Sequence, residues 1–359
     1  MSIPDKSPPL FNETREMPAH MNGDTSPAAA PADAENDTAS GIQQLSRIID
    51  ELRTQLHRVF IGQDSLIDGL LIALFCGGHV LIEGVPGLGK TLIAKALSRL
   101  VDCKFNRIQF TPDLMPSDIT GGHVFNMKTR EFQFYPGPVF TNILLADEIN
   151  RAPAKTHSAL LEIMEESHVT LDGKHYEIEP PFFTIATQNP IESEGTYALP
   201  EAQLDRFMFK LVIDYPPEAD EYEILSNAIS DNNAPDDILP HLTPLLDSET
   251  ARNVRRCLQD IIVDPKIIEF ANAIVRRTRS WKEVYHGASP RAGITLLRGA
   301  RVPALMAGRD FVTPDDVLDL CLSTLRHRVI LTPEAEVEGR TVDGILEDII
   351  QSVEVPRFQ

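Results

Sequence analysis

Eight consecutive residues, Gly84-Val85-Pro86-Gly87-Leu88-Gly89-Lys90-Thr91, match the pattern GxxxxGK[ST]. A strand-like apolar stretch precedes them, and a helical pattern begins near Lys90, which is the context this motif requires. Such glycines let backbone N–H groups curl around a β-phosphate, and the helix N-terminus adds its positive end. Lys90 can then reach the β- and γ-phosphates, while Thr91 can ligate Mg²⁺. The motif predicts an ATP site, and a purely structural glycine turn is the alternative.

Two carboxylates follow a second apolar stretch, residues 143–146. Asp147 at the end of that strand is expected to hold the Mg²⁺ shell, and Glu148 to polarise the attacking water. A solvated acidic pair on a loop is the alternative. Together with the phosphate loop, the pair favours hydrolysis over binding alone.

Asn189 follows the next buried strand, so we expect it at the same carboxyl edge as Asp147. Its side-chain amide could orient the attacking water near the γ-phosphate. The alternative is a turn-forming Asn before Pro190.

Unbroken apolar runs alternate with helical stretches over residues 61–215, which predicts a doubly wound α/β domain with a parallel sheet. Two short polar-centred segments interrupt this alternation and predict inserted β-hairpins. The expected strands are 79–83, 105–110, 143–146, 182–186 and 208–213; the helices are 90–100, 154–166 and 202–207; the hairpins are 123–134 and 168–178.

Composition changes along the chain predict four regions. Residues 1–40 contain seven acidic residues, six prolines and seven alanines without periodicity, which is typical of a disordered tail. Helical periodicity dominates after residue 217, and Asp264, Ser289 and Thr313 each precede a proline at a predicted helix start. We therefore expect an acidic tail (1–40), an α/β core (41–215), a helical domain (216–331) and a C-terminal helical extension or tail (332–359).

The overall charge excludes some functions. The chain has 53 acidic and 33 basic residues and a net charge of −20, which argues against general binding of nucleic acid.

The four cysteines show no zinc-binding spacing, so we expect reduced, buried thiols in a cytoplasmic protein. No segment is long and apolar enough to predict membrane insertion.

Six separated strings resemble the MoxR family of AAA+ ATPases. They are GHVLIEGVPG (78–87), QFTPDLMPSD (109–118), ADEINRA (146–152), LLEIMEE (160–166), ATQNP (186–190) and ASPRA (288–292). The resemblance implies a P-loop NTPase core with hairpin inserts and a small α-helical lid, as the pattern of elements also predicts.

Four further site residues come from the resemblance alone. It implies that Arg206 projects into the nucleotide site of a neighbouring subunit and that Arg291 is the sensor 2 arginine of the lid. The alternatives are a surface salt bridge to Asp205 and a solvent-facing arginine at a helix start. Ile61 and Gly62 resemble the segment that packs around adenine, although an ordinary turn between helices is also possible.

The resemblance further implies a ring, with a hexamer expected, that matures or remodels client protein complexes. A partner carrying a von Willebrand factor A domain is expected. A chelatase-like ATPase subunit for metal or cofactor insertion is the main alternative. A DNA-dependent motor and a nucleotide-gated scaffold without turnover are further alternatives.

Overall fold

The computed structural model describes residues 32–190, 197–229 and 234–358. Most of the predicted acidic tail lies outside these residues, and the predicted disorder of residues 1–31 therefore stays a prediction. The first helix of the described residues is α1 (Ala32–Val59). Its apolar face is buried from Ile42 onward, with Ile49, Leu52 and Leu56 fully enclosed.

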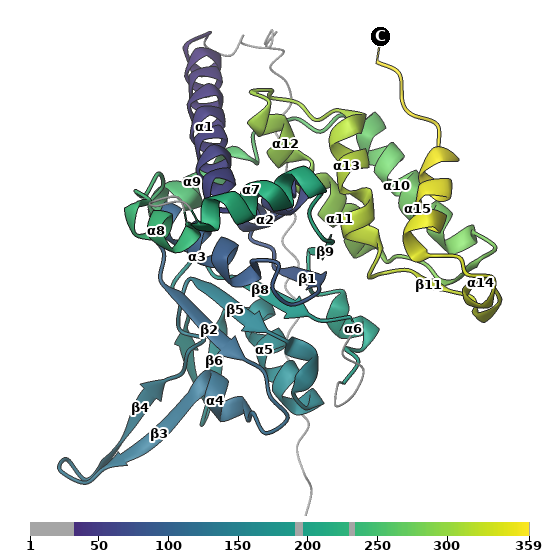
Figure 1. Cartoon of the computed structure of the whole chain (residues 1–359). Helices are drawn as coiled ribbons and strands as arrows, with labels where there is room; N and C mark the ends of the chain where they lie inside the picture. Colours follow the sequence, from purple (N-terminus) through teal and green to yellow (C-terminus); the bar gives the residue numbers. More distant parts are fainter. Residues whose placement is uncertain (1–31, 191–196, 230–233, 359) are drawn as a thin grey trace, which may run out of the picture. The chain divides into compact units, whose positions relative to one another are not determined.

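A parallel five-stranded sheet forms the centre of the α/β core (Figure 1). The strand order is β2-β5-β8-β1-β9, so the strand that leads into the phosphate loop lies between two neighbours. The strands are β1 (Val80–Gly84), β2 (Phe105–Gln109), β5 (Ile143–Asp147), β8 (Phe183–Gln188) and β9 (Phe209–Ile213), and each overlaps a predicted strand. The predicted fold class is confirmed.

Side chains of the central strands alternate between two cores, one on each face of the sheet. Val80 and Ile82 point into the core that contains α2 (Asp64–Cys76) and α3 (Lys90–Leu100). Leu81 points into the second core, which contains α5 (Ala154–Glu166). The edge strand β2 differs from the predicted pattern, because only Ile108 of its residues is buried. An edge strand has one open side, so two-faced burial is not required there.

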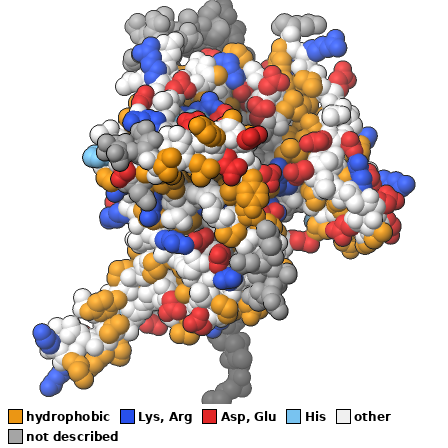
Figure 2. Space-filling model, viewed as in Figure 1, with side chains coloured by type: hydrophobic (Ala, Val, Ile, Leu, Met, Phe, Trp, Pro, Cys, Tyr) orange, Lys and Arg blue, Asp and Glu red, His pale blue; other side chains and the backbone are white. Residues whose placement is uncertain are grey.

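Both predicted hairpins form. The first pairs β3 (Gly121–Asn126) with β4 (Glu131–Pro136) after the short helix α4 (Pro116–Thr120), and the second pairs β6 (His168–Leu171) with β7 (Lys174–Glu177). The Phe134 ring stacks on the Tyr176 ring at a centroid separation of 4.0 Å, which joins the two hairpins. Apolar side chains cover much of the first hairpin, and basic side chains lie at its tip (Figure 2).

The C-terminal part is mainly helical, as predicted. Asp264, Ser289 and Thr313 cap three of its helices at the expected positions. The sequence did not predict the antiparallel pair β10 (Val284–His286) and β11 (Ile330–Leu331). The helices are α7 (Glu218–Ile229), α8 (Pro235–Ile238), α9 (Ser248–Cys257), α10 (Pro265–Ser280), α11 (Pro290–Gly299), α12 (Arg301–Met306), α13 (Pro314–Leu325), α14 (Pro333–Val337) and α15 (Val342–Gln351).

The segment after residue 331 folds as α14 and α15. Ile345, Leu346 and Ile349 of α15 are fully buried in the same core as α10 and α13. The four predicted region boundaries stay predictions.

All four cysteines are free, and among them only Cys321 is fully buried. The expectation that every thiol is buried is therefore wrong, because Cys76, Cys103 and Cys257 lie near the surface ends of packed elements and keep partial exposure. Within the described part of the chain, no helix combines the length and the apolar character needed to cross a bilayer.

His79, immediately before β1, provides a pH-dependent contribution to stability. Its Nε2 lies 2.9 Å from the Met164 carbonyl and its Nδ1 accepts the Thr184 amide at 3.0 Å, so the ring fits the neutral tautomer. Burial lowers the pKa of His79 to about 4.

We expect the stability of the folded state to be fully present above pH 6.5 and to fall as the pH drops from 6.5 to 4. Over this window His79 takes up a proton in the unfolded chain but not in the folded one. This difference lowers the free energy of unfolding by about 3 kcal/mol. Urea unfolding at several pH values measures this slope. His79→Gln should reduce it without abolishing it, because burial also keeps the pKa of His327 well below its ordinary value. An unchanged slope in the variant would contradict the assignment.

Candidate active site

The phosphate loop joins β1 to α3, and its backbone requires glycine. Gly87 and Gly89 have φ angles of 89° and 74°, a region that side chains disfavour. A Cβ on Gly89 would lie 2.8 Å from the Phe60 ring. The loop therefore holds its N–H groups in a curved path that ends at the N-terminus of α3, where an anion is stabilised.

Lys90 lies inside this loop, with its Nζ donating to the Gly84 carbonyl at 2.5 Å. Partial burial lowers the pKa of Lys90, while the charges of Asp147 and Glu148 act in the opposite direction. The three side chains are therefore within electrostatic reach of one another. This arrangement brings together the phosphate loop and the acidic pair that the sequence predicted separately.

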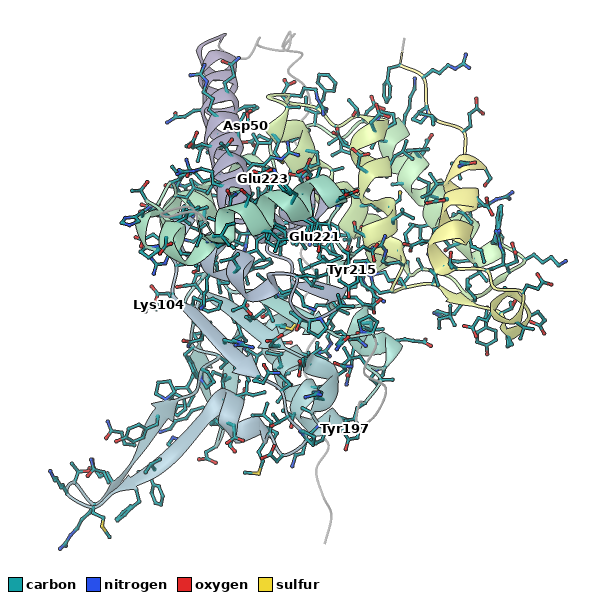
Figure 3. The ribbon with its side chains drawn as sticks, viewed as in Figure 1. Asp50, Lys104, Tyr197, Tyr215, Glu221 and Glu223 are labelled. Atoms are coloured by element: carbon teal, nitrogen blue, oxygen red, sulfur yellow. The ribbon has the colours of Figure 1, made fainter. Side chains whose placement is uncertain are left out.

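A pocket of about 410 Å³ adjoins the loop and is mostly apolar. The end of α1, the phosphate loop, the segment after β9 and α7 form its walls, with Phe60, Leu92 and Ile224 among the lining side chains. Tyr215 and Glu221 lie on this side of the molecule (Figure 3). The size and the mostly apolar lining of this pocket suit a purine base beside the phosphates.

The structure separates the two residues predicted to contact adenine. Ile61 lines the pocket, whereas Gly62 is not among its lining residues. Gly62 has a φ of 72°, and a Cβ there would collide with the carboxylate of Asp220 on α7. Gly62 thus allows α7 to approach α1, and Ile61 provides the apolar contact.

Asp147 ends β5 and is largely buried, with a side-chain exposure of 14%. Its Oδ1 accepts the Thr187 hydroxyl at 2.5 Å, and its Oδ2 accepts the Arg107 guanidinium, also at 2.5 Å. Neighbouring parallel strands thus supply its partners, since Thr187 is on β8 and Arg107 is on β2.

Glu148 adopts a left-handed backbone conformation, with a φ of 54°. This turn directs the chain away from the strand, and the Glu148 amide donates to the Thr187 hydroxyl at 2.9 Å. The Glu148 carboxylate accepts Gln109 Nε2 at 2.8 Å and pairs with Arg151 at 3.3 Å. Two donors therefore fix the carboxylate that was predicted to act on water.

Asn189 follows β8 and is buried at the same carboxyl edge of the sheet as Asp147. Lys90, Thr91, Asp147, Glu148 and Asn189 all follow the ends of parallel strands, where ligands of open α/β sheets bind. Among the described residues, no group of three or more His, Cys, Asp or Glu side chains could form a dedicated metal cage. One hydroxyl and one carboxylate suit Mg²⁺ that arrives with ATP, because this ion keeps most of its ligands as water and phosphate oxygens.

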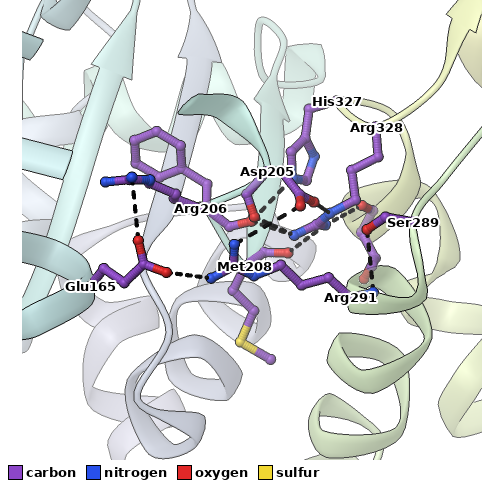
Figure 4. A network of polar contacts seen from close by, with 10 residues as sticks. Glu165, Asp205, Arg206, Met208, Ser289, Arg291, His327 and Arg328 are labelled. Carbon is purple, nitrogen blue, oxygen red and sulfur yellow. Dashed lines mark hydrogen bonds and ion pairs between the residues drawn. The ribbon is translucent and has the colours of Figure 1, made fainter. Parts of the chain in front are cut away.

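Arg206 and Arg291 lie together, away from the phosphate loop and the acidic pair. Both pair with Glu165 at the end of α5, each at 3.3 Å, and Arg291 also lies 4.0 Å from Asp205 (Figure 4). The alternative considered for Arg206, a salt bridge to Asp205, is wrong, because Arg206 pairs with Glu165.

This cluster is at the amino edge of the sheet. Arg206 lies three residues before the start of β9, and the Met208 amide donates to the carbonyl of His79, the residue before β1. The phosphate loop begins at the other end of β1, about 13 Å away along a strand of this length. In this arrangement, the lid arginine Arg291 does not line the nucleotide pocket of its own chain.

Arg328 holds the segment that carries Arg206. Its side chain is 3% exposed and pairs with Asp205 at 2.6 Å. The same guanidinium donates to the carbonyls of Phe207 and Met208 at 2.7 and 3.2 Å, and the neighbouring His327 also contacts the Phe207 carbonyl (Figure 4). The helical C-terminal part therefore fixes the turn before β9.

Sequence reasoning missed four polar residues that contact the predicted site residues, namely Arg107, Gln109, Glu165 and Thr187, and it missed Arg328, which holds the segment next to Arg206. Gln109, Glu165 and Thr187 lie within the quoted family strings, and the positions of Gln109 and Thr187 at strand ends were a usable signal. Arg107 and Arg328 carried no such signal, because their partners are 40 and 123 residues away in the chain.

A phosphate loop after a central parallel strand, a neighbouring strand ending in Asp147 and Glu148, and a helical lid define a P-loop NTPase of the AAA class. A family model described as "ATPase family associated with various cellular activities (AAA)" matches residues 79–209, and an AAA lid domain model matches residues 276–349.

Related proteins make the family more specific. Over 92% of its length, the chain is 42% identical to "Chaperone MoxR1" of Mycobacterium tuberculosis, covering 86% of that protein. It is 29% identical to "Protein MoxR" of Methylorubrum extorquens, with 84% of this chain and 93% of that protein covered. A crystal structure of a Cytophaga hutchinsonii protein superposes with a TM-score of 0.82 at 36% identity, covering 90% of this chain and 99% of the other. The chain belongs to the MoxR family of AAA ATPases. Membership of this family makes it an enzyme that binds and hydrolyses ATP.

Proposed function

We propose that this ATPase works as a ring, with a hexamer expected from the family, in which each ATP is held by one chain and completed by the next. The placement of Arg206 and Arg291 at the amino edge of the sheet carries this proposal. ATP at the carboxyl edge needs a cation near its γ-phosphate for fast hydrolysis. These two arginines are too far away to serve their own chain, but they are placed together to serve a neighbour.

Within one chain, five residues act on the substrate. The backbone of residues 84–89 and Lys90 hold the β- and γ-phosphates, and Thr91 with Asp147 would hold Mg²⁺. The ion, when bound with ATP, neutralises charge on the phosphate oxygens. Glu148 takes a proton from the attacking water, and Asn189 orients that water. Gln109 and Arg151 keep the Glu148 carboxylate in position.

Arg206 and Arg291 of one chain stabilise the charge that develops in the neighbour's site. The contact with nucleotide expected of the sensor 2 arginine Arg291 would then be made with the ATP of the neighbouring chain. Glu165 pairs with both arginines, so it presents them as a unit across the subunit boundary. Since Arg291 is on α11 and Glu165 is on α5, a change in the neighbour's nucleotide can alter the contact between lid and core.

The output of this cycle is mechanical. We propose that the ring matures or remodels protein complexes in the cytoplasm, in agreement with the name "Chaperone MoxR1" of the relative that is 42% identical. A protein with a von Willebrand factor A domain is the expected partner. The free cysteines suit a reducing compartment.

The test is ATP turnover together with sedimentation velocity, with and without ATP and Mg²⁺. We expect turnover only with Mg²⁺, complete loss on chelation with EDTA, and recovery when Mg²⁺ is restored, because Thr91 and Asp147 supply no positive charge and Lys90 alone does not neutralise the phosphates. We also expect a ring-sized species with ATP. A monomer that turns over ATP at full rate would contradict the shared site.

A further inference from the structure

A second cavity, of about 440 Å³, lies where the C-terminal end of α2 meets three helices of the C-terminal part, α9, α11 and α12. It shares no lining residue with the nucleotide pocket. The residues that line it are Cys76, Arg255, Leu258, Gln259, Arg298 and Arg301. Half of these residues are arginines, and none is acidic.

Among the residues that the structure describes, no carboxylate pairs with Arg255, Arg298 or Arg301, and none of these side chains donates a hydrogen bond. Arg255 and Arg298 are exposed to solvent, and Arg301 is half-buried. The Nε of Arg301 is also closed off from solvent and has no partner. Arginine stays protonated in proteins, so the cavity carries three positive charges in a chain whose net charge is −20.

The protein itself offers little to balance these charges. Burial raises the pKa of the Cys76 thiol to about 12, so it is neutral, and it donates to the Arg298 carbonyl at 3.4 Å. The Arg255 guanidinium lies against Gly77, the residue that ends α2. A helix C-terminus supplies only about half a negative charge, which leaves most of the positive charge uncompensated.

The walls of the cavity are firmly packed. Phe75 of α2, Val254 of α9 and Leu296 of α11 are almost completely buried in one continuous core. Gly77 has a φ of 68°, and any side chain there would collide with the Arg255 guanidinium. The helices that carry the arginines are therefore fixed before any ligand arrives, while the side chains of Arg255 and Arg298 are exposed to solvent.

We propose that this cavity, referred to below as the arginine pocket, binds a small anion that carries two or more phosphate groups. Guanidinium groups match phosphate oxygens with paired hydrogen bonds, and three of them require a compact ligand with several negative charges. Gln259 adds a neutral amide for a further contact. The volume suits a ligand between pyrophosphate and a nucleotide in size. An acidic surface of a second copy of the chain is the rival occupant.

Pyrophosphate is the probe, titrated calorimetrically into the full chain. Lys90→Ala removes the phosphate-loop lysine and so weakens the pyrophosphate site there, although its backbone N–H groups remain. We expect wild type to show two sites, and Lys90→Ala to weaken one of them and leave the other unchanged. Adding Arg255→Gln or Arg298→Gln to Lys90→Ala should weaken that site at least about tenfold, since each removes charged hydrogen bonds to phosphate.

Arg252→Gln in the same background is the matched control, because it removes one positive charge from α9 at an exposed position outside the pocket. It should leave pyrophosphate affinity within about twofold. Thermal unfolding without ligand checks that the variants fold. Equal weakening by Arg252→Gln, or no remaining site in Lys90→Ala, would overturn the proposal. Arg298→Gln that alters sedimentation but not pyrophosphate binding would also overturn it and would assign the pocket to a second copy.

Discussion

Glu148→Gln is expected to bind ATP and to turn it over about 10²–10⁴-fold more slowly than wild type, which is the usual contribution of a general base. Glutamine has the same shape, so its amide oxygen can still accept the hydrogen bond from Gln109. It cannot take a proton from water. Single-turnover ATP hydrolysis and nucleotide binding, measured on the same preparation, separate the two effects.

Glu166→Gln is the matched control, because it removes an exposed carboxylate at the end of α5 that takes no part in the site. It should turn over ATP at nearly the wild-type rate. Normal turnover by Glu148→Gln would exclude it as the base. Loss of ATP binding in Glu148→Gln would instead indicate that the carboxylate mainly positions Lys90, whose pKa it helps to keep high.

Arg206→Ala is expected to lower turnover about 10³–10⁵-fold while ATP binding is retained, as for other arginines supplied across a subunit boundary. The decisive measurement is a mixture with Lys90→Ala. A ring interface is active when the chain with Arg206→Ala provides an intact phosphate loop and its neighbour with Lys90→Ala provides an intact arginine. Random mixing in equal amounts restores about a quarter of the interfaces.

The mixture should therefore recover about a quarter of the wild-type turnover, although each variant alone is inactive. Arg276→Ala is the matched control, since this arginine is exposed on α10 and outside the cluster around Glu165. Two inactive variants that stay inactive when mixed would show that Arg206 acts within its own chain or only supports the fold. If Arg206 acted within its own chain, a rearrangement would have to move its side chain from the amino edge of the sheet to the carboxyl edge.

The pairing of Arg206 with Glu165 has a further consequence for the mechanism. One carboxylate on the core holds one arginine of the core and one of the lid. When a neighbour's γ-phosphate attracts either arginine, the contact between α5 and α11 must change. In the proposed ring, the communication between nucleotide state and lid position would therefore lie at the subunit boundary, not in the chain that binds the ATP.

Local sequence patterns were sufficient for the parts of the site that lie on one strand and its following turn. The phosphate loop, Asp147, Glu148 and Asn189 could be predicted because each follows an apolar strand, and parallel strands bring their carboxyl ends to one edge. The helices that begin near Lys90 and at Pro265, Pro290 and Pro314 could also be predicted, since their caps are encoded by adjacent residues.

Tertiary structure decided what depends on residues that are far apart in the chain. The ion pairs of Glu165 and Arg328 could not be predicted, because an ion pair depends on which surfaces the sheet and the lid bring together. The position of Arg291 at the amino edge, and the convergence of Arg255, Arg298 and Arg301 on one cavity, also follow from helix packing. The sequence determined the chemistry of the ATP site, since its motifs are local. Only the packed chain decided which side chains share a site, because that choice depends on long-range contacts.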